Sequence, residues 1–394
     1  MKSILYFYTS CLFNIAFMNK FIIVILSLLF MTNCDYKDSR EENRELFLSM
    51  KDKRTCFPED LFESFEVVPL ETNDSVLLGD ITEISKILIK DNRIYMGSWR
   101  YIYVFDDKGK HIRTMRHIGQ GPGCYLSVSS FVIWDNGDIY VLDRISSAIY
   151  KYSKDDAFLG KVPISYDDLV ALNVKDMMCL NDSLLLLRSD ERRGVPFKMH
   201  TMKRESGEVI NHYFVQHDRI ISYWICPNYS FYKGNLYLNM HQDNNVYQLT
   251  TDSAYVHYTI NVENRIPPKG FWDNMQMSDM QLVSTVIREG YVSHIPFFME
   301  TENNILLKFE DNFDGNIRYY TFIDKNTRKN YLIEHLRMED LDYIPDYMYP
   351  IKDGEAYFLI PADIICEKGE KFKQKYCPEL KEDDNPVLCK VKIK

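Results

Sequence analysis

Residues 131–143 read FVIWDNGDIYVLD and form the clearest strand–turn–strand pattern in the chain. The segment FVIW is followed by the turn DNGD and then by a second apolar strand, IYVLD. An Asn-Gly pair between two apolar runs favours a tight hairpin, because both central residues of such a turn adopt positive φ. Further apolar runs at 149–152 and 159–164 complete a repeat unit of four strands.

This four-strand unit recurs along the chain. Its second strands begin near residues 94, 139, 184, 236, 305 and 356. Four-stranded units at a period of about 40–50 residues are typical of a β-propeller. A single blade cannot cover both of its faces, so the blades must stack in a ring. The sequence therefore predicts an all-β, six-bladed β-propeller at residues 62–394.

Two segments stand outside the repeats. The strand at 65–70 is expected to pair within the last blade and close the ring, which removes an open sheet edge. The sequence interval between the second strands of the fourth and fifth units is the longest, and it contains an insertion at about 262–294. Within it, Ser278 and Gln281 fit a capping box, and apolar residues follow at helical spacing until Gly290, so we expect a short helix.

The composition excludes several classes of protein. Apolar residues make up 46% of the 394 residues, which is enough for a large core and rules out global disorder. The 57 acidic side chains outnumber the 47 basic ones, for a net charge of −10. This acidity, without a long basic run, argues against a nucleic-acid ligand. We expect no cofactor and a monomer.

The N-terminus resembles a secretory signal. An apolar run at 21–31 follows Lys20 and precedes Cys34, and it is too short to span a bilayer. We predict a signal peptide at 1–33, lipidation of Cys34 as in bacterial lipoproteins, and a polar tether at 34–61. The chain is then an outer-membrane lipoprotein that faces the periplasm or the cell surface. An uncleaved anchor, and a start at Met18, remain open alternatives.

The cysteines give no clear disulfide framework, even for an oxidising envelope. Seven of the nine remain once Cys11 is cleaved off and Cys34 is acylated, so at least one thiol stays free. Cys366, Cys377 and Cys389 lie close in sequence and could supply one disulfide. No C-x-x-C motif occurs, which disfavours zinc.

The chain resembles a known family at three places. HIGQGPG at 117–123 with Tyr125, the hairpin at 136–143 and the opening VPLET at 68–72 resemble six-bladed β-propeller lipoproteins related to the NHL-repeat family. The resemblance covers residues 62–394 and implies architecture and an envelope location, with no chemistry. Members typically carry Glu where this chain has Cys124.

One face of the predicted ring collects the candidate ligand residues. The loops between second and third strands and the links between blades lie on this face, and three of the four tryptophans fall in them. Flat aromatics beside charged and amide groups suit a sugar ring or an extended peptide. The candidates are Trp99, Arg100, Gln120, Arg144, Arg188, Tyr223, Trp224, His241, Asp243, Trp272 and Glu310. Alternatively, the tryptophans fill gaps between blades and the charges form a solvated rim.

Other motifs give weaker signals. The glycine-rich loop at 119–123 lacks the Lys-Ser/Thr of a phosphate loop and no helix follows it. Residues 310–315 imitate only part of a calcium loop. His241, with Asp243 two residues on, is the best acid–base candidate, although an exposed histidine usually has no such role.

We therefore predict a non-catalytic binding lipoprotein that engages a glycan, a peptide or an envelope protein. One alternative is a metal-dependent hydrolase or lyase, because related six-bladed propellers include such enzymes. It requires two or three of Asp143, Asp190, His241, Asp243 and Glu310 to converge. A further alternative is a scaffold for another envelope protein.

Overall fold

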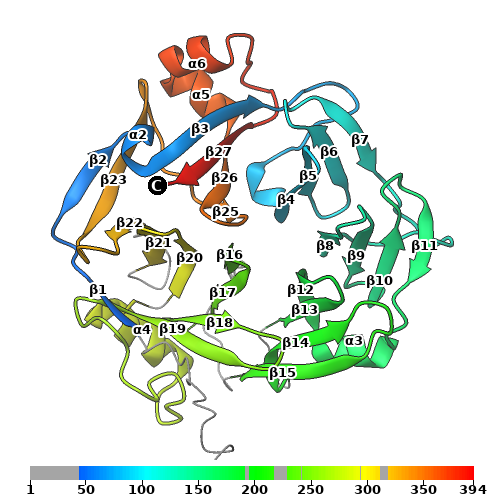
Figure 1. Cartoon of the computed structure of the whole chain (residues 1–394), viewed down its shortest axis with the longest axis horizontal. Coiled ribbons are helices and arrows are strands. Elements are labelled where there is room, and N and C mark those ends of the chain that lie inside the picture. The colour runs from blue at the N-terminus through cyan, green and yellow to red at the C-terminus, as the bar shows by residue number, and fades with distance from the viewer. Residues whose placement is uncertain (1–43, 191–194, 217–228, 241, 293, 311–317) are drawn as a thin grey trace, which may run out of the picture. The chain divides into compact units, whose positions relative to one another are not determined.

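The computed structural model describes residues 44–190, 195–216, 229–240, 242–292, 294–310 and 318–394. Their strands form six sheets around a common centre (Figure 1). Blades 1 and 2 contain β4 (Lys86–Lys90), β5 (Arg93–Gly97), β6 (Ile102–Asp106), β7 (His111–Met115), β8 (Ser130–Ile133), β9 (Ile139–Asp143), β10 (Ala148–Tyr152) and β11 (Phe158–Lys161). Blade 3 contains β12 (Val174–Asn181), β13 (Leu184–Ser189), β14 (Phe197–Lys203) and β15 (Val209–Val215).

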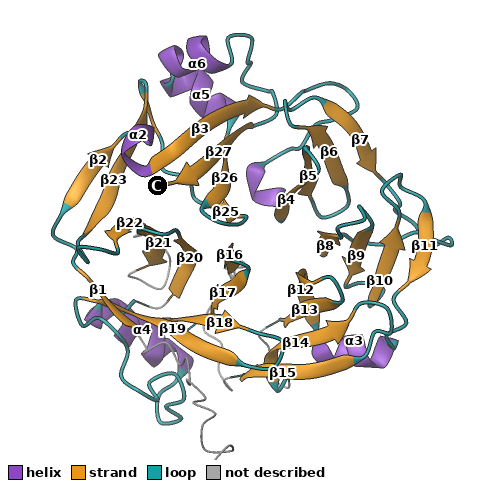
Figure 2. Ribbon diagram, in the orientation of Figure 1, coloured by secondary structure: helices purple, strands orange, loops and turns teal. Residues whose placement is uncertain are grey.

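The remaining blades carry additional strands. Blade 4 contains β16 (Tyr229–Tyr232), β17 (Asn235–Asn239), β18 (Asn245–Leu249), β19 (Ala254–Val262) and β1 (Arg44–Leu48). Blade 5 contains β20 (His294–Glu300), β21 (Asn304–Glu310), β22 (Arg318–Asp324), β23 (Asn330–Met338), β24 (Leu341–Asp342) and β2 (Lys53–Cys56). Blade 6 contains β25 (Tyr349–Pro350), β26 (Glu355–Ile360), β27 (Val387–Ile393) and β3 (Phe62–Pro69). The predicted six-bladed propeller is confirmed, and each predicted second strand lies in its blade (Figure 2).

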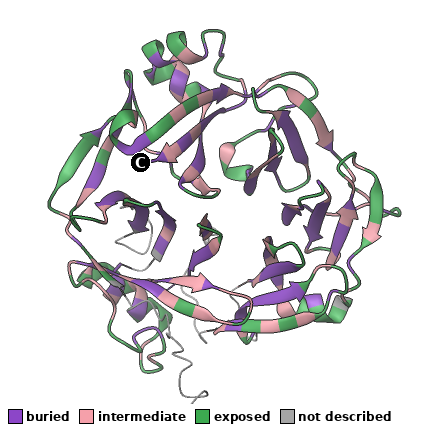
Figure 3. Ribbon diagram, viewed as in Figure 1, coloured by how far each residue is buried: buried purple, intermediate pink, exposed green. Residues whose placement is uncertain are grey.

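The ring is held by an apolar cluster at each of its six interfaces. Each cluster draws buried side chains from two neighbouring blades, and the sixth joins blade 6 to blade 1. Buried residues therefore follow the middle strands of every blade, whereas exposed residues gather on the outer strands and loops (Figure 3). Burial of both faces of each blade is what the repeat requires.

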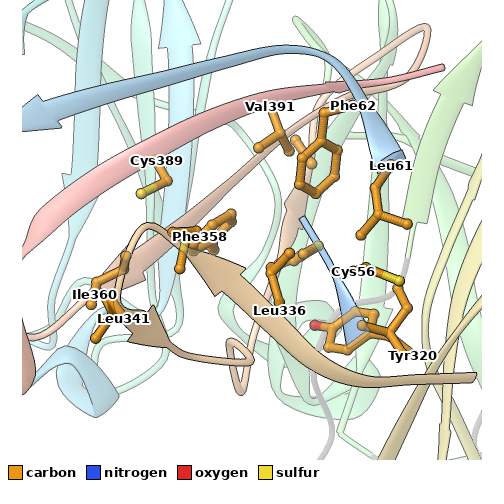
Figure 4. Close-up of a cluster of buried hydrophobic side chains, with 14 of the residues drawn as sticks. Cys56, Leu61, Phe62, Tyr320, Leu336, Leu341, Phe358, Ile360, Cys389 and Val391 are labelled. Atoms are coloured by element: carbon orange, nitrogen blue, oxygen red, sulfur yellow. The ribbon is translucent and has the colours of Figure 1, made fainter. Parts of the chain in front are cut away.

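Ring closure joins the two ends of the propeller in one sheet. β3 pairs antiparallel with the C-terminal β27, with Val67 opposite Cys389. Phe62 at the start of β3 lies in one buried cluster with Phe358 of β26 and Val391 of β27 (Figure 4). The predicted closure by the strand at 65–70 is confirmed, and the sheet extends to Phe62.

The predicted tether is partly wrong, because residues 44–61 belong to the folded domain. β1 adds to β19 of blade 4 in parallel, and β2 adds to β23 of blade 5 in the same way. A short helix, α2 (Pro58–Leu61), leads into β3. These strands cover the outer edges of two blades, which would otherwise present unpaired backbone groups.

The helices lie in connections between strands. α4 (Asp279–Glu289) confirms the predicted insertion helix, with Ser278 and Gln281 in a capping box and Gly290 in the left-handed region. A 3-10 turn, η1 (Ile81–Glu83), and the helices α3 (Tyr166–Leu172), α5 (Ala362–Lys368) and α6 (Glu370–Tyr376) were not expected. None of the helices in the described residues is long and apolar enough to cross a membrane.

The suggested disulfide among the C-terminal cysteines is not formed. Cys366, Cys377 and Cys389 are free, as are the other three cysteines in the described part of the chain. Burial raises the pKa of the Cys377 thiol to about 11, so this side chain is protonated at neutral pH. The apolar clusters between blades therefore hold the domain together without a disulfide between described residues.

Truncation of Phe358 tests the closing cluster. Phe358 is 0% exposed, and Phe358→Ala leaves a cavity between blades 5 and 6, so we expect a loss of about 3–5 kcal/mol in the free energy of unfolding. Phe57→Ala is the control, because Phe57 is 43% exposed. Urea unfolding followed by circular dichroism measures both. Equal losses in the two variants would contradict this account of closure.

Candidate functional site

Three polar residues meet where the innermost strands of blades 1, 2 and 3 begin. Lys86 of β4 places its Nζ 3.1 Å from Oδ1 of Asp176 on β12 and 3.2 Å from Oγ of Ser130 on β8. The Ser130 hydroxyl donates a hydrogen bond of 2.6 Å to the same Asp176 oxygen. Lys86 also donates to the carbonyl oxygen of Met177. All three polar side chains are buried, so they link three blades near the centre of the ring.

Burial and the neighbouring charges shift the pKa values of this ion pair in opposite directions. Burial is the largest single influence and would lower the pKa of Lys86, but the Asp176 carboxylate and the Tyr229 hydroxyl together outweigh it, and the pKa is raised. Burial alone would raise the pKa of Asp176, but the charges of Lys86 and then Arg188 hold it below its ordinary value. Both groups are therefore charged at neutral pH. The Lys86 Nζ also lies 5.7 Å from the ring centroid of Tyr229 on β16.

A cavity of about 840 Å³ opens beside this ion pair. We call this space the mouth cavity. The residues that line it come from the start of blade 1, the inner strands of blades 1–3, and the β5–β6 and β9–β10 loops. They are Leu77, Leu78, Gly79, Glu83, Ser85, Lys86, Ser98, Trp99, Arg100, Tyr101, Tyr103, Val128, Ser129, Ser130, Arg144, Lys175, Asp176 and Arg188. Its volume lies within the range of about 300–1,000 Å³ typical of small-molecule sites.

Four of the predicted ligand residues lie together in the mouth cavity: Trp99, Arg100, Arg144 and Arg188. Trp99 is 56% exposed, which is unusual for so large an apolar side chain. The Arg144 Nη2 lies 2.9 Å from Oδ2 of Asp190, and Lys175 Nζ lies 3.8 Å from Oδ1 of the same carboxylate. Asp190 thus fixes two cations at one edge of the cavity.

Two other predicted residues line a separate, smaller cavity. Asp243 and Trp272 meet in a space of about 160 Å³ beside the β17–β18 loop and the insertion. Trp272 is only 8% exposed and packs edge-on against Phe271 at 5.0 Å. Asp243 accepts a hydrogen bond of 2.6 Å from the Tyr247 hydroxyl. Trp272 therefore belongs to the buried cluster of the insertion, a position that neither sequence interpretation expects.

Gln120 does not line the mouth cavity. It lies in the loop at 117–125, where Ile118 and Tyr125 form an isolated bridge. This loop packs on blade 2, because the Tyr152 hydroxyl donates to the Gly123 carbonyl at 2.8 Å. The glycine-rich stretch is thus a turn between blades: Gly123 has φ +76°, and an added Cβ would meet the Phe158 ring.

The remaining candidates lie outside the described residues. This holds for Tyr223, Trp224, His241 and Cys34, for the side chain of Glu310, and for the imitation of a calcium loop after it.

Three of the carboxylates proposed for a metal-dependent enzyme have other partners. Asp143 is buried and accepts hydrogen bonds from Leu126 N at 2.7 Å and Ser127 Oγ at 2.7 Å. Asp190 pairs with Arg144, and Asp243 accepts from Tyr247. Within the described ranges, no three His, Cys, Asp or Glu side chains are grouped so that they could hold a metal ion.

The residues predicted from the sequence do not include the buried ion pair at the base of the cavity. Lys86, Ser130 and Asp176 are polar residues on the innermost strands of three successive blades. They lie about 45 residues apart, which is the repeat period of these blades. A polar residue at corresponding positions of three successive blades is the signal that could have identified them.

Removal of one partner tests the ion pair. Asp176→Asn leaves the Lys86 charge uncompensated, and we expect it to cost about 3–5 kcal/mol in unfolding free energy. Replacement of both, Lys86→Met with Asp176→Leu, should cost less than Asp176→Asn alone. Urea unfolding at pH 7 measures all variants. A loss of unfolding free energy in Asp176→Asn no larger than that in the double variant would contradict the account.

The ion pair also predicts a pH dependence. Because the pKa of Asp176 is lowered on folding, its contribution is present above the carboxylate's unfolded pKa and lost as pH falls. Because the pKa of Lys86 is raised on folding, its contribution to stability is present below the pKa of an unfolded lysine and is lost as pH rises through the higher folded pKa. The wild type should therefore lose stability relative to the double variant on acidification below about pH 4. A difference that stays constant from pH 7 to pH 3 would contradict this.

Comparisons with known proteins agree with the fold. Residues 49–392 match the model of a domain of unknown function, DUF4934. No curated protein matches the sequence. One similar solved structure is a Bacteroides fragilis NCTC 9343 protein described as a candidate exported protein, with 18% identity, a TM-score of 0.63, and coverage of 88% of this chain and 99% of that one.

Two further structures are more distant. A member of the DUF4221 family from Bacteroides vulgatus ATCC 8482 has 10% identity, a TM-score of 0.46, and coverage of 85% and 97%. A virginiamycin B lyase from Staphylococcus aureus has 9% identity, a TM-score of 0.38, and coverage of 75% and 81%. We infer nothing from scores this low. The family match spans nearly the whole described domain, and the chain belongs to the DUF4934 family.

Proposed function

We propose that this protein is a non-catalytic binding protein that holds an oligosaccharide in the mouth cavity. The observation that carries this proposal is the exposed Trp99 ring at the edge of a cavity that also contains Arg100, Arg144 and Arg188. A flat ring at low conformational cost, next to a few directed polar groups, is the usual composition of a ligand site.

The cavity lining favours a saccharide over a peptide. Four serines and two tyrosines line it, so hydroxyl groups surround the space. A peptide that binds as an added strand needs an open sheet edge. The innermost strands β4, β8 and β12 contact one another instead, which leaves little room for a strand between them.

The export of this protein is part of the proposal. The apolar run at 21–31 followed by Cys34 supports a secreted lipoprotein of the outer membrane, facing the periplasm or the surface. The similar Bacteroides fragilis protein is itself described as a candidate exported protein. An envelope location would give the mouth cavity access to extracellular glycans.

Replacement of Trp99 tests the saccharide site. Trp99→Ala removes the exposed ring and should weaken binding to any glycan that the wild type selects on an array by about tenfold or more. Tyr255→Ala is the matched control, because Tyr255 is 50% exposed on β19 and does not line the cavity. Loss of binding in both variants, or in neither, would refute the assignment.

Metal analysis separates binding from the lactonase-like alternative. We expect the purified full chain to carry no stoichiometric metal and to bind its glycan equally well with and without a chelator. A bound metal at one equivalent, or a metal-dependent turnover, would favour the hydrolase or lyase. A glycan array without any binder, together with co-purification of one envelope protein, would favour the scaffold.

Substitution of Cys34 tests the anchor. Cys34→Ser removes the thiol that would be acylated, so the protein should move from the membrane fraction to the soluble envelope fraction. Cys124→Ser is the control. Retention of Cys34→Ser in membranes would favour an uncleaved anchor.

A further inference from the structure

The mouth cavity is cationic in a protein that is acidic as a whole. Its lining holds five cationic side chains, Lys86, Arg100, Arg144, Lys175 and Arg188, and two carboxylates, Glu83 and Asp176. Asp190 adds a third carboxylate beside Arg144 and Lys175. The complete chain nevertheless has a net charge of −10. The sequence thus concentrates positive charge at one place on an otherwise acidic molecule.

Ion pairs within the described residues engage several of these cations. Lys86 is matched by Asp176, and Arg144 and Lys175 share the single carboxylate of Asp190. Arg100 is exposed and has no hydrogen bond or ion pair to another residue of the described ranges. Glu83 is the other carboxylate of the lining. Among the described residues that line or flank the cavity, five cations therefore stand beside three carboxylates.

The walls of the cavity strengthen the effect of these charges. A cleft in which one sign of charge predominates, bounded by low-dielectric protein, focuses its field and raises the local concentration of oppositely charged ligands. At an ionic strength of about 0.1 M, charges more than about 10 Å away are largely screened, so the overall acidity acts only weakly inside the cavity.

The chemistry of the cations defines the ligand groups. Three of the five are arginines, whose planar guanidinium groups match carboxylates and sulfate-like anions with two parallel hydrogen bonds. Arg100 directly follows the exposed Trp99 in the β5–β6 loop. An anionic group and a sugar ring can thus be held side by side.

We propose that the ligand of the mouth cavity is an acidic oligosaccharide whose carboxylate or sulfate groups pair with Arg100 and Arg188 while a sugar ring lies over Trp99. This inference rests on the proposed function, because it names the class of saccharide that the same cavity binds.

Matched pairs of probes test the charge requirement. Isothermal titration of the full chain compares trigalacturonate with its methyl ester for the carboxylate, and sulfated maltotriose with maltotriose for the sulfate. We expect at least one acidic probe to bind about tenfold or more tightly than its neutral partner. Its affinity should also fall as sodium chloride rises from about 50 to 500 mM, since salt screens the pairing.

Variants locate the binding in the cavity. Arg100→Gln and Arg188→Gln should each weaken binding of the acidic probe by about tenfold and should weaken binding of its neutral partner by less. Arg337→Gln, at an exposed arginine of β23, is the matched control. If Arg188→Gln fails to fold by circular dichroism, Arg100→Gln still decides, because its side chain is exposed.

The outcomes separate this inference from the proposed function. Equal binding of acidic and neutral probes that still depends on Trp99 would overturn the charge requirement and leave the saccharide site in place. No binding of any saccharide would overturn both. Binding of a glutamate heptapeptide without binding of either acidic saccharide would assign the cavity to an acidic peptide and overturn this inference.

Discussion

The buried ion pair between Lys86 and Asp176 is the contact on which the site depends. It joins the innermost strands of blades 1 and 3, which share no sheet, and Ser130 of blade 2 completes the link. A buried charge is tolerated only when it is paired and hydrogen-bonded, so these strands have little freedom to move apart. The ion pair therefore forms a fixed polar floor, and the arginines and Trp99 surround a space whose shape it helps to define.

A second constraint comes from the closed ring. Six apolar interfaces set the blades in order, and β3 of the N-terminal part closes the sheet that contains the C-terminal β27. The loops at the ends of second strands can then vary without loss of the fold, which is how propellers and other repeat folds accommodate function. Here the β5–β6 and β9–β10 loops carry Trp99, Arg100 and Arg144 to one cavity.

The sequence predicted the architecture better than the site. The recurring four-strand repeat identified six blades, and the capping box at Ser278 identified α4. The short strands of 44–56 gave no repeat signal, because their pairing with blades 4 and 5 depends on residues more than two hundred positions away. Of the predicted ligand residues, Trp99, Arg100, Arg144 and Arg188 line one cavity, whereas Trp272 lies in the insertion core. The sequence prediction did not include the ion pair, whose two residues lie 90 positions apart on strands of different blades.

A crystal structure of the protein with a bound acidic oligosaccharide is the most direct measurement. We predict density for a sugar ring on Trp99 in the mouth cavity, with a carboxylate or sulfate within hydrogen-bonding distance of the Arg100 or Arg188 guanidinium and an unchanged Lys86–Asp176 pair. Density for the saccharide on another face, or an empty cavity at a saturating concentration, would contradict the assignment.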